Sequence, residues 1–179
     1  MTGHSSATIK SYMKLFREMV ASTLEDDDNR IGGPNVIVEI DETKMGKRKY
    51  HRGHRVDGVW VIGGVERTEE KGCFVEVVAD RTADTLLEVI SRHVLEGSII
   101  YTDMWRGYNG LEGLNPVTGV HTNTIEGLWN GLKLRIPARD RTKDEVTNHL
   151  HEFVWRKKKN NIWGGFINAL KTTSYPDPE

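Results

Sequence analysis

Three acidic side chains in the sequence have the types and settings of a divalent-metal site. Asp41 follows the apolar run NVIVEI, Asp103 follows SIIYT, and Glu126 lies in the segment HTNTIEGLWNGLK. Carboxylates from two strand ends and one helix can together hold two divalent metal ions for phosphoryl transfer. These three acids are therefore the candidate catalytic and metal-binding residues.

The hydrophobic pattern predicts the elements that must position these acids. Near-continuous apolar runs predict strands at 36–40, 57–66, 73–79 and 98–102. Helical spacing of apolar residues predicts helices at 8–24, 82–95, 121–135 and 142–158. Two antiparallel links followed by a crossover helix give a mixed α/β sheet flanked by helices, in the order of an RNase H-like core. We therefore expect Asp41 and Asp103 at the ends of neighbouring strands.

Glu126 lies on a predicted amphipathic helix with one polar and one apolar side. The polar side carries Asn123, Glu126, Asn130 and Lys133. The apolar side, which we expect to pack on the sheet, carries Ile125, Leu128, Trp129 and Leu132. This pattern predicts that the helix aims its polar side at the two aspartates, with Glu126 as a metal ligand and Lys133 as a phosphate contact.

Oxygen ligands alone favour Mg²⁺ or Mn²⁺ over Zn²⁺. The single cysteine, Cys73, lies in the apolar run GCFVEVVAD and is predicted to be a buried core thiol. Trp129 and Trp155 are also predicted to pack in the core. The pair Gly63-Gly64 inside a strand predicts a bulge or a close approach of another group.

Basic residues are concentrated in two segments, although the net charge is only −1. The first is KMGKRKYHRGHR at 44–55, which has no acidic residue and reads as a loop or sheet edge; the second is 133–159. Segregated positive charge can face phosphates on a near-neutral protein. The candidate nucleic-acid contacts are Lys47, Arg48, Lys49, Arg52, Lys133 and Arg135.

A length of 179 residues is typical of one domain with a small appendage. We expect an N-terminal helix and linker at 1–35, a catalytic domain at 36–160 and a C-terminal tail at 161–179. No apolar run approaches the roughly 20 residues that span a bilayer, so no membrane association is expected. The lone cysteine favours an intracellular location, which in a eukaryote would be the nucleus.

Three segments carry a family resemblance. VEIDETKMGKRKYHRGHRVDGVWVIGGVER, YTDMWRGY and GVHTNTIEGLWNGLKLR resemble the catalytic domain of Merlin-type DDE transposases and their bacterial insertion-sequence relatives. The most specific part is HTNTIE followed by Lys133, seven residues after Glu126. The resemblance covers about residues 36–160.

The resemblance implies an RNase H-like fold, two Mg²⁺ or Mn²⁺ ions, and cleavage and strand transfer of DNA at transposon ends. By position, Asp41, Asp103 and Glu126 match the family's metal-binding acids, and Lys133 matches a basic residue that contacts DNA. Some relatives use Asn as the third catalytic residue, so Asn123 stands beside Glu126 as an open alternative. The implied partners are transposon-end and target DNA and a second copy of the chain.

Two departures from the family pattern bear on activity. Only the 8–24 helix precedes the catalytic segment, where relatives carry a DNA-recognition region. Asp103 and Glu126 are 23 residues apart, an interval that predicts a shortened domain without its fifth strand. A domesticated or degenerate DNA-binding or interaction module that retains the fold is therefore the alternative function. A stand-alone RNase H-like nuclease is a third.

Overall fold

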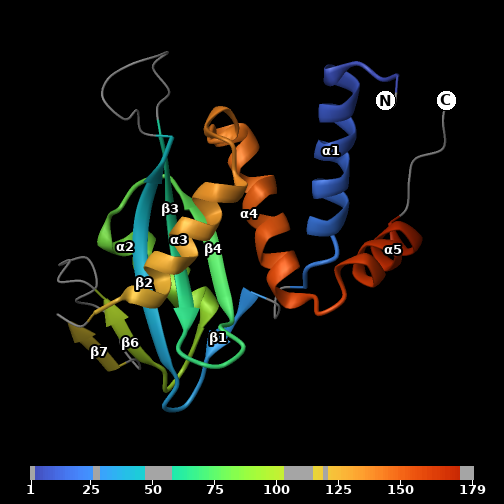
Figure 1. Cartoon of the computed structure of the whole chain (residues 1–179). Helices are drawn as coiled ribbons and strands as arrows, with labels where there is room; N and C mark the ends of the chain where they lie inside the picture. Colours follow the sequence, from blue (N-terminus) through green and yellow to red (C-terminus); the bar gives the residue numbers. More distant parts are fainter. Residues whose placement is uncertain (1–2, 26–28, 47–57, 103–114, 119–120, 174–179) are drawn as a thin grey trace.

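The computed structural model describes residues 3–25, 29–46, 58–102, 115–118 and 121–173 (Figure 1). The helices are α1 (Ser6–Ala21), α2 (Ala83–His93), α3 (Asn123–Arg135), α4 (Lys143–Lys158) and α5 (Ile162–Thr172), with a 3₁₀ turn at Ala138–Asp140. The strands are β1 (Ile31–Gly32), β2 (Ile37–Met45), β3 (Val59–Glu66), β4 (Cys73–Val78), β5 (Val94–Leu95), β6 (Ile99–Thr102) and β7 (Asn115–Thr118).

The main sheet has five strands in the order β4-β3-β2-β6-β7. The pairs β4-β3 and β3-β2 are antiparallel, whereas β2-β6 and β6-β7 are parallel. Helix α2 provides the crossover from β4, at one edge, back to β6 beside β2. This is the mixed sheet of an RNase H-like fold, and the predicted fold class is confirmed.

The prediction that the fifth strand is missing is wrong. Strand β7 pairs with β6 over four residues, from Ile99↔Asn115 to Thr102↔Thr118. It was missed because it is short, contains Pro116 and lies in a segment rich in glycine. Proline is tolerated on an edge strand, where one side of the backbone has no partner strand. The domain is therefore not shortened at this edge of the sheet.

Strand β2 is longer than its apolar run indicates. It continues through Asp41 to Met45 and pairs with β3 over that whole length. Asp41 therefore lies in the middle of the strand rather than at its end, and Lys44 belongs to the strand rather than to a basic loop. The antiparallel ladder with β3 explains the extension, because it satisfies the backbone of the polar residues that follow Asp41.

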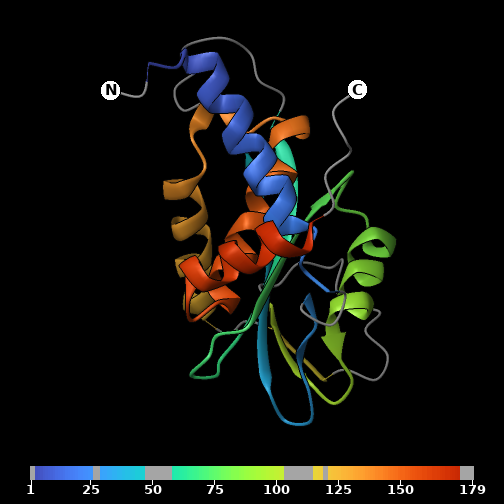
Figure 2. The same ribbon diagram turned by 90° about the vertical axis from the view of Figure 1, so that its right-hand side faces the viewer.

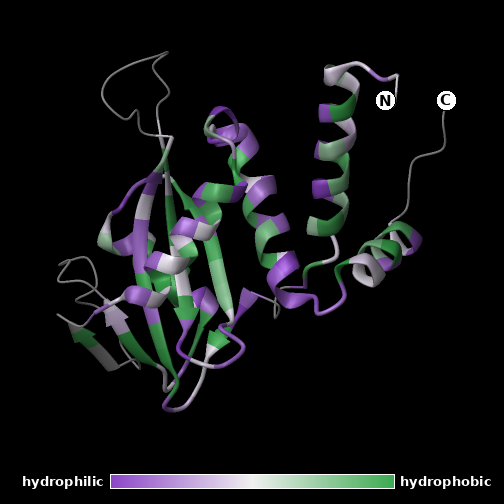
Figure 3. Cartoon of the chain, viewed as in Figure 1, coloured by the Kyte–Doolittle hydropathy of each residue, from purple (hydrophilic) through white to green (hydrophobic). Residues whose placement is uncertain are grey.

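The sheet lies between two helical layers, with α2 on one side and α3 with α4 on the other (Figure 2). Residues of β2 alternate between them, so that Val38 and Ile40 pack in the cluster under α2 and Met45 packs in the cluster under α3. Strand β3 is mainly hydrophobic, whereas α3 and α4 mix hydrophobic and hydrophilic residues along their length (Figure 3). The two faces of β2 therefore have different neighbours.

Helices α1 and α5 form a further layer against α4 (Figure 1). Met19 and Val20 of α1 are buried with Trp155 and Ala169, whereas Tyr12 is exposed. Leu15 and Phe16 are also exposed. No helix in the described part of the chain is both long and apolar enough to cross a membrane.

Helix α5 lies in the segment 161–179, which was expected to be a tail. Gly164 and Gly165 disfavour a helix there. They are outweighed by the side chain of Asn161, which accepts a hydrogen bond from the Gly164 amide at 2.8 Å, and by burial of Ala169. The division of the chain at residues 35 and 160 stays a prediction.

Candidate active site

Asp41 lies on the face of β2 that α3 covers. Its Oδ2 atom accepts a hydrogen bond of 2.8 Å from the indole Nε1 of Trp129. The carboxylate is half-buried, so it is partly shielded from water yet still reachable. A helix residue thus sets the orientation of the candidate catalytic aspartate.

Gly63 makes this contact possible. It pairs with Asp41 across the β2-β3 ladder, and a Cβ atom built on it would lie 2.6 Å from Cη2 of Trp129. Its neighbour Gly64 makes room in the same way for Phe74 on the opposite face, at 2.3 Å from a built Cβ. The paired register is unbroken, so of the two predicted meanings of Gly63-Gly64 the close approach is confirmed.

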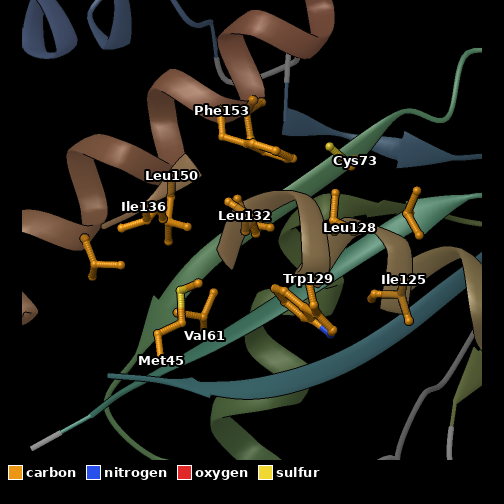
Figure 4. Packing of buried hydrophobic residues seen from close by; sticks show 14 of the residues in the cluster. Met45, Val61, Cys73, Ile125, Leu128, Trp129, Leu132, Ile136, Leu150 and Phe153 are labelled. Atoms are coloured by element: carbon orange, nitrogen blue, oxygen red, sulfur yellow. The ribbon is translucent and has the colours of Figure 1, made fainter. Parts of the chain in front are cut away.

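Helix α3 has the two sides that its sequence predicts, but the prediction that its polar side faces Asp41 is wrong, because Asp41 is bonded to Trp129 of the apolar side. The apolar side is buried against β2 and β3, with Trp129 and Leu132 pointing at the strands (Figure 4). The polar side, which carries Asn123, Glu126, Asn130 and Lys133, is exposed. Glu126 is one turn before Trp129, and so the residue that orients Asp41 and the candidate third acid share one stretch of helix.

The complete acidic triad cannot be assembled from the described residues, because Asp103 lies outside them. Within the described part of the chain, no three His, Cys, Asp or Glu side chains form a metal-binding group. The last described residue of β6, Thr102, is buried and pairs with Ile40, the residue before Asp41. The carboxylate oxygens of Asp41 and Glu126 are donors of the type that Mg²⁺ and Mn²⁺ prefer.

Two other acids of β2 have different environments. Glu39 faces α3, is fully buried, and is bound by Arg67 and by the backbone of α3. Glu42 points to the opposite side of the strand and pairs with Arg81 at 3.3 Å. In the sequence, Glu39 is the one polar residue of the apolar run 36–40. A charged residue inside a predicted buried strand is the signal that could have identified it.

The predicted nucleic-acid residues are only partly described. Lys133 and Arg135 are exposed on α3, whereas Lys47, Arg48, Lys49 and Arg52 lie outside the described residues. Arg135 also has its guanidinium 5.8 Å from the ring centre of Phe153.

A groove of about 610 Å³ runs along α3 between β3 and α4. Its cations are Lys71, Arg135 and Lys157, and its described lining has no acidic residue. Asn123, Gly127 and Gly131 form its α3 wall, and the two glycines keep this wall shallow. The sequence reasoning singled out neither Lys71 nor Lys157 as a site residue. The Nζ atom of Lys157 donates to the Lys71 carbonyl at 3.4 Å, so the two residues meet at the end of α4.

Several core predictions are confirmed. Cys73 is 2% exposed, and burial is the main cause that raises the pKa of its thiol, so it is a core residue rather than a nucleophile. Trp129 and Trp155 are both buried.

The sheet order is that of an RNase H-like domain, and the class of protein is that of the DDE transposases. The model of one family, the ISXO2-like transposase domain, matches residues 19–169, and the chain belongs to that family. No curated protein matches the chain.

Proposed function

We propose that this domain cleaves DNA and transfers strands at transposon ends in a reaction that depends on divalent metal ions. The observation that carries the proposal is the attachment of Asp41 to Trp129, on the same helix that presents Glu126. Family membership supports a transposase role. We also propose that the chain is related to Merlin-type transposases and acts as a homodimer.

Asp41, Asp103 and Glu126 would hold two Mg²⁺ or Mn²⁺ ions. Bound metal would activate a water or a DNA 3′-hydroxyl and stabilise the leaving oxygen of an in-line displacement at phosphorus. Asn123 stands one turn before Glu126 on the exposed side of α3 and is the other candidate for the third position.

The residues of the chain itself contribute orientation. Trp129 fixes the Asp41 carboxylate by a hydrogen bond from a buried donor, which removes the freedom of an exposed side chain to swing away. Packing of α3 on β2 and β3 fixes the helix that presents Glu126. Preorganised ligands of this kind lower the entropic cost of reaching the transition state.

The basic groove supplies a path for the DNA backbone next to this site. Lys71, Arg135 and Lys157 can bind successive phosphates, and Gly127 and Gly131 let a strand approach α3 closely. Lys133 is exposed on the same helix and adds a further positive charge. The predicted contacts Lys47, Arg48, Lys49 and Arg52 belong to the proposal by sequence alone. Contacts to phosphates give affinity without reading base sequence.

Nicking of supercoiled plasmid DNA tests the reaction. The wild-type chain should nick duplex DNA with Mg²⁺ or Mn²⁺ and should not do so in EDTA. Asp103→Asn should abolish nicking while DNA binding remains. Nicking that is unchanged in Asp103→Asn would contradict the mechanism.

The groove makes a separate prediction about salt. Lys71→Ala with Arg135→Ala should weaken duplex DNA binding and flatten the plot of log affinity against log salt by about 0.9 for each lost phosphate contact. Lys10→Ala, on the exposed side of α1, is the matched control and should change neither quantity. An equal slope in the double variant and the wild type would remove the groove from the DNA path.

A degenerate DNA-binding module remains the competing function. Its main support was the absent fifth strand, and β7 removes that support. It would be favoured by salt-dependent DNA binding without metal-dependent nicking. Cleavage of an RNA–DNA hybrid in preference to duplex DNA would favour a stand-alone nuclease instead.

A further inference from the structure

Glu39 is a fully buried carboxylate two residues before Asp41 on the same face of β2. Its Oε1 atom pairs with Nε of Arg67 at 2.6 Å, and its Oε2 atom accepts a hydrogen bond of 2.9 Å from the backbone amide of Ile125. Glutamate is almost never fully buried unless it is paired, and here each oxygen has a partner. Glu39 is thus bound to the start of α3.

The first turn of α3 needs this partner. Thr122 precedes the helix but makes no side-chain capping bond. The first backbone bond of the helix runs from the Glu126 amide to the Thr122 carbonyl, so the Ile125 amide lies before the helical bonds begin. Glu39 supplies the missing acceptor from a distant part of the chain, and its negative charge suits the positive end of the helix dipole.

Arg67 adds a second attachment at the same place. It donates through Nη2 to the backbone carbonyl of His121, just before α3 begins. Its guanidinium lies 4.6 Å from the ring centre of Tyr101, which pairs with Glu39 across the β2-β6 ladder. Arg67 therefore joins β3, β2 and β6 to the entrance of the helix.

The two acids on the α3 face of β2 bind α3 at two separate points. Glu39 accepts a hydrogen bond from the backbone amide of Ile125, and Asp41 accepts one from the indole of Trp129, four residues further along the helix. A shift of α3 along β2 would therefore disturb both contacts.

We propose that Glu39 and Arg67 are positioning residues, which hold the first turn of α3 so that Asn123 and Glu126 stand in register with Asp41. This inference rests on the proposed DNA cleavage. It also separates Glu39 from the metal ligands, because its two oxygens bind Arg67 and the helix backbone.

The opposite face of β2 offers a closely matched control. Arg81 pairs with Glu42 of β2 and stacks 4.1 Å from the ring centre of Trp60, as Arg67 pairs with Glu39 and stacks on Tyr101. Both arginine side chains are 34% exposed. Arg81→Lys therefore imposes the same chemical change as Arg67→Lys, on the face that α2 covers.

The test compares Arg67→Lys with Arg81→Lys by two measurements. Lysine keeps a positive charge near Glu39 but cannot bind both Glu39 and the His121 carbonyl as the guanidinium does. Hydrogen exchange of the Ile125 amide, measured without metal or DNA, should accelerate about tenfold in Arg67→Lys and stay unchanged in Arg81→Lys. The kcat of plasmid nicking should fall about 100-fold in Arg67→Lys alone, with an unchanged Kd for DNA.

Tyr101→Leu is the second variant, because it removes the ring under Arg67 and leaves the buried ion pair in place. It should show smaller changes of the same sign in both measurements. Wild-type exchange and nicking in both Arg67→Lys and Tyr101→Leu would overturn the inference. A different result separates the two proposals: the wild type does not nick DNA, but hydrogen exchange of the Ile125 amide is still faster in Arg67→Lys. In that case the contact holds α3 in the fold, whereas the proposed function and the catalytic role of Glu39 and Arg67 are both rejected.

Discussion

Each face of β2 carries an ion pair between a glutamate and an arginine, but the two pairs have different structural roles. Toward α2, Arg81 pairs with Glu42 beside Trp60, and the buried residues of that face, Val38 and Ile40, are apolar. Toward α3, the corresponding pair of Arg67 and Glu39 is joined to the helix backbone. One pair lies beside an apolar layer, whereas the other ties a helix to the strand that carries Asp41.

The comparison shows how each face of β2 accommodates a buried carboxylate. Burying a carboxylate is costly unless it is paired and hydrogen-bonded, and an apolar residue of similar size is often as stable. On the α2 face the Glu42 side chain is 5% exposed and is paired with Arg81, and its neighbours Val38 and Ile40 are apolar. On the α3 face, Glu39 and Asp41 occupy successive inward positions of β2 and both bind α3, so we expect this face to carry the chemistry and the α2 face to carry stability.

The largest expected effect comes from removing a carboxylate charge on the α3 face. Asp41→Asn keeps an oxygen that can accept from Trp129 but weakens metal binding, and a loss of several kcal/mol of transition-state stabilisation lowers kcat about 1,000-fold. Glu42→Gln is the matched change on the other face and should leave kcat within about twofold. Equal losses in the two variants, measured by plasmid nicking, would contradict the division between the faces.

The next effect is on stability alone. Ile40 is fully buried under α2, so Ile40→Ala should lower the free energy of unfolding by about 3 kcal/mol, because it removes apolar burial and leaves a cavity. Urea denaturation measures this loss. At a temperature where the variant stays folded, its kcat for nicking should equal that of the wild type, and a large fall in kcat would show that the α2 face also shapes the site.

Substitutions at two adjacent glycines allow the closest comparison of the two faces. Gly63→Ala and Gly64→Ala each place a methyl group against an aromatic ring, Trp129 and Phe74 respectively. Each should cost about 1–3 kcal/mol of stability, measured by thermal or urea unfolding. Nicking should suffer only in Gly63→Ala, because its methyl group displaces the ring that orients Asp41. An activity loss confined to Gly64→Ala would reverse the assignment.

The smallest effect concerns pH. Burial is the main cause that lowers the pKa of His149 on α4, and the nearby cation of Arg17 lowers it further. A group with a lowered pKa in the folded state contributes stability above its usual value near 6.5 and loses it as the pH falls through the folded value. Unfolding temperature should therefore drop on acidification below about pH 6.5.

His149→Gln should make that acid slope shallower, while His4→Gln, in an exposed N-terminal position, should leave it unchanged. His151, whose pKa is also lowered by burial, accounts for part of the remaining slope. An identical slope in His149→Gln and the wild type would assign the acid sensitivity elsewhere.

The parts of the fold that follow local rules were predictable. Near-continuous apolar runs indicate β3, β4 and β6, and helical periodicity indicates α2, α3 and α4 close to their observed bounds. The packing side of α3 was predicted residue by residue and is buried. These features follow from burial patterns within a short window of sequence.

The parts that depend on distant partners were not predictable. Strand β7 pairs with β6 although Asn115 and Pro116 are residue types depleted in strands. Glu39 and Ile125 are 86 residues apart, and nothing in either local sequence indicates that they meet. Asp41 looked like a strand end because the apolar run stops there, whereas pairing with β3 carries the strand further.

Direct titration with Mn²⁺, followed by electron paramagnetic resonance of the free ion, tests the central claim that the acids on the α3 side form a two-metal site. The wild-type chain should bind two Mn²⁺ ions, Asp41→Asn should lose at least one of them, and Glu42→Gln should bind as the wild type does. Unchanged Mn²⁺ binding in Asp41→Asn would contradict the claim.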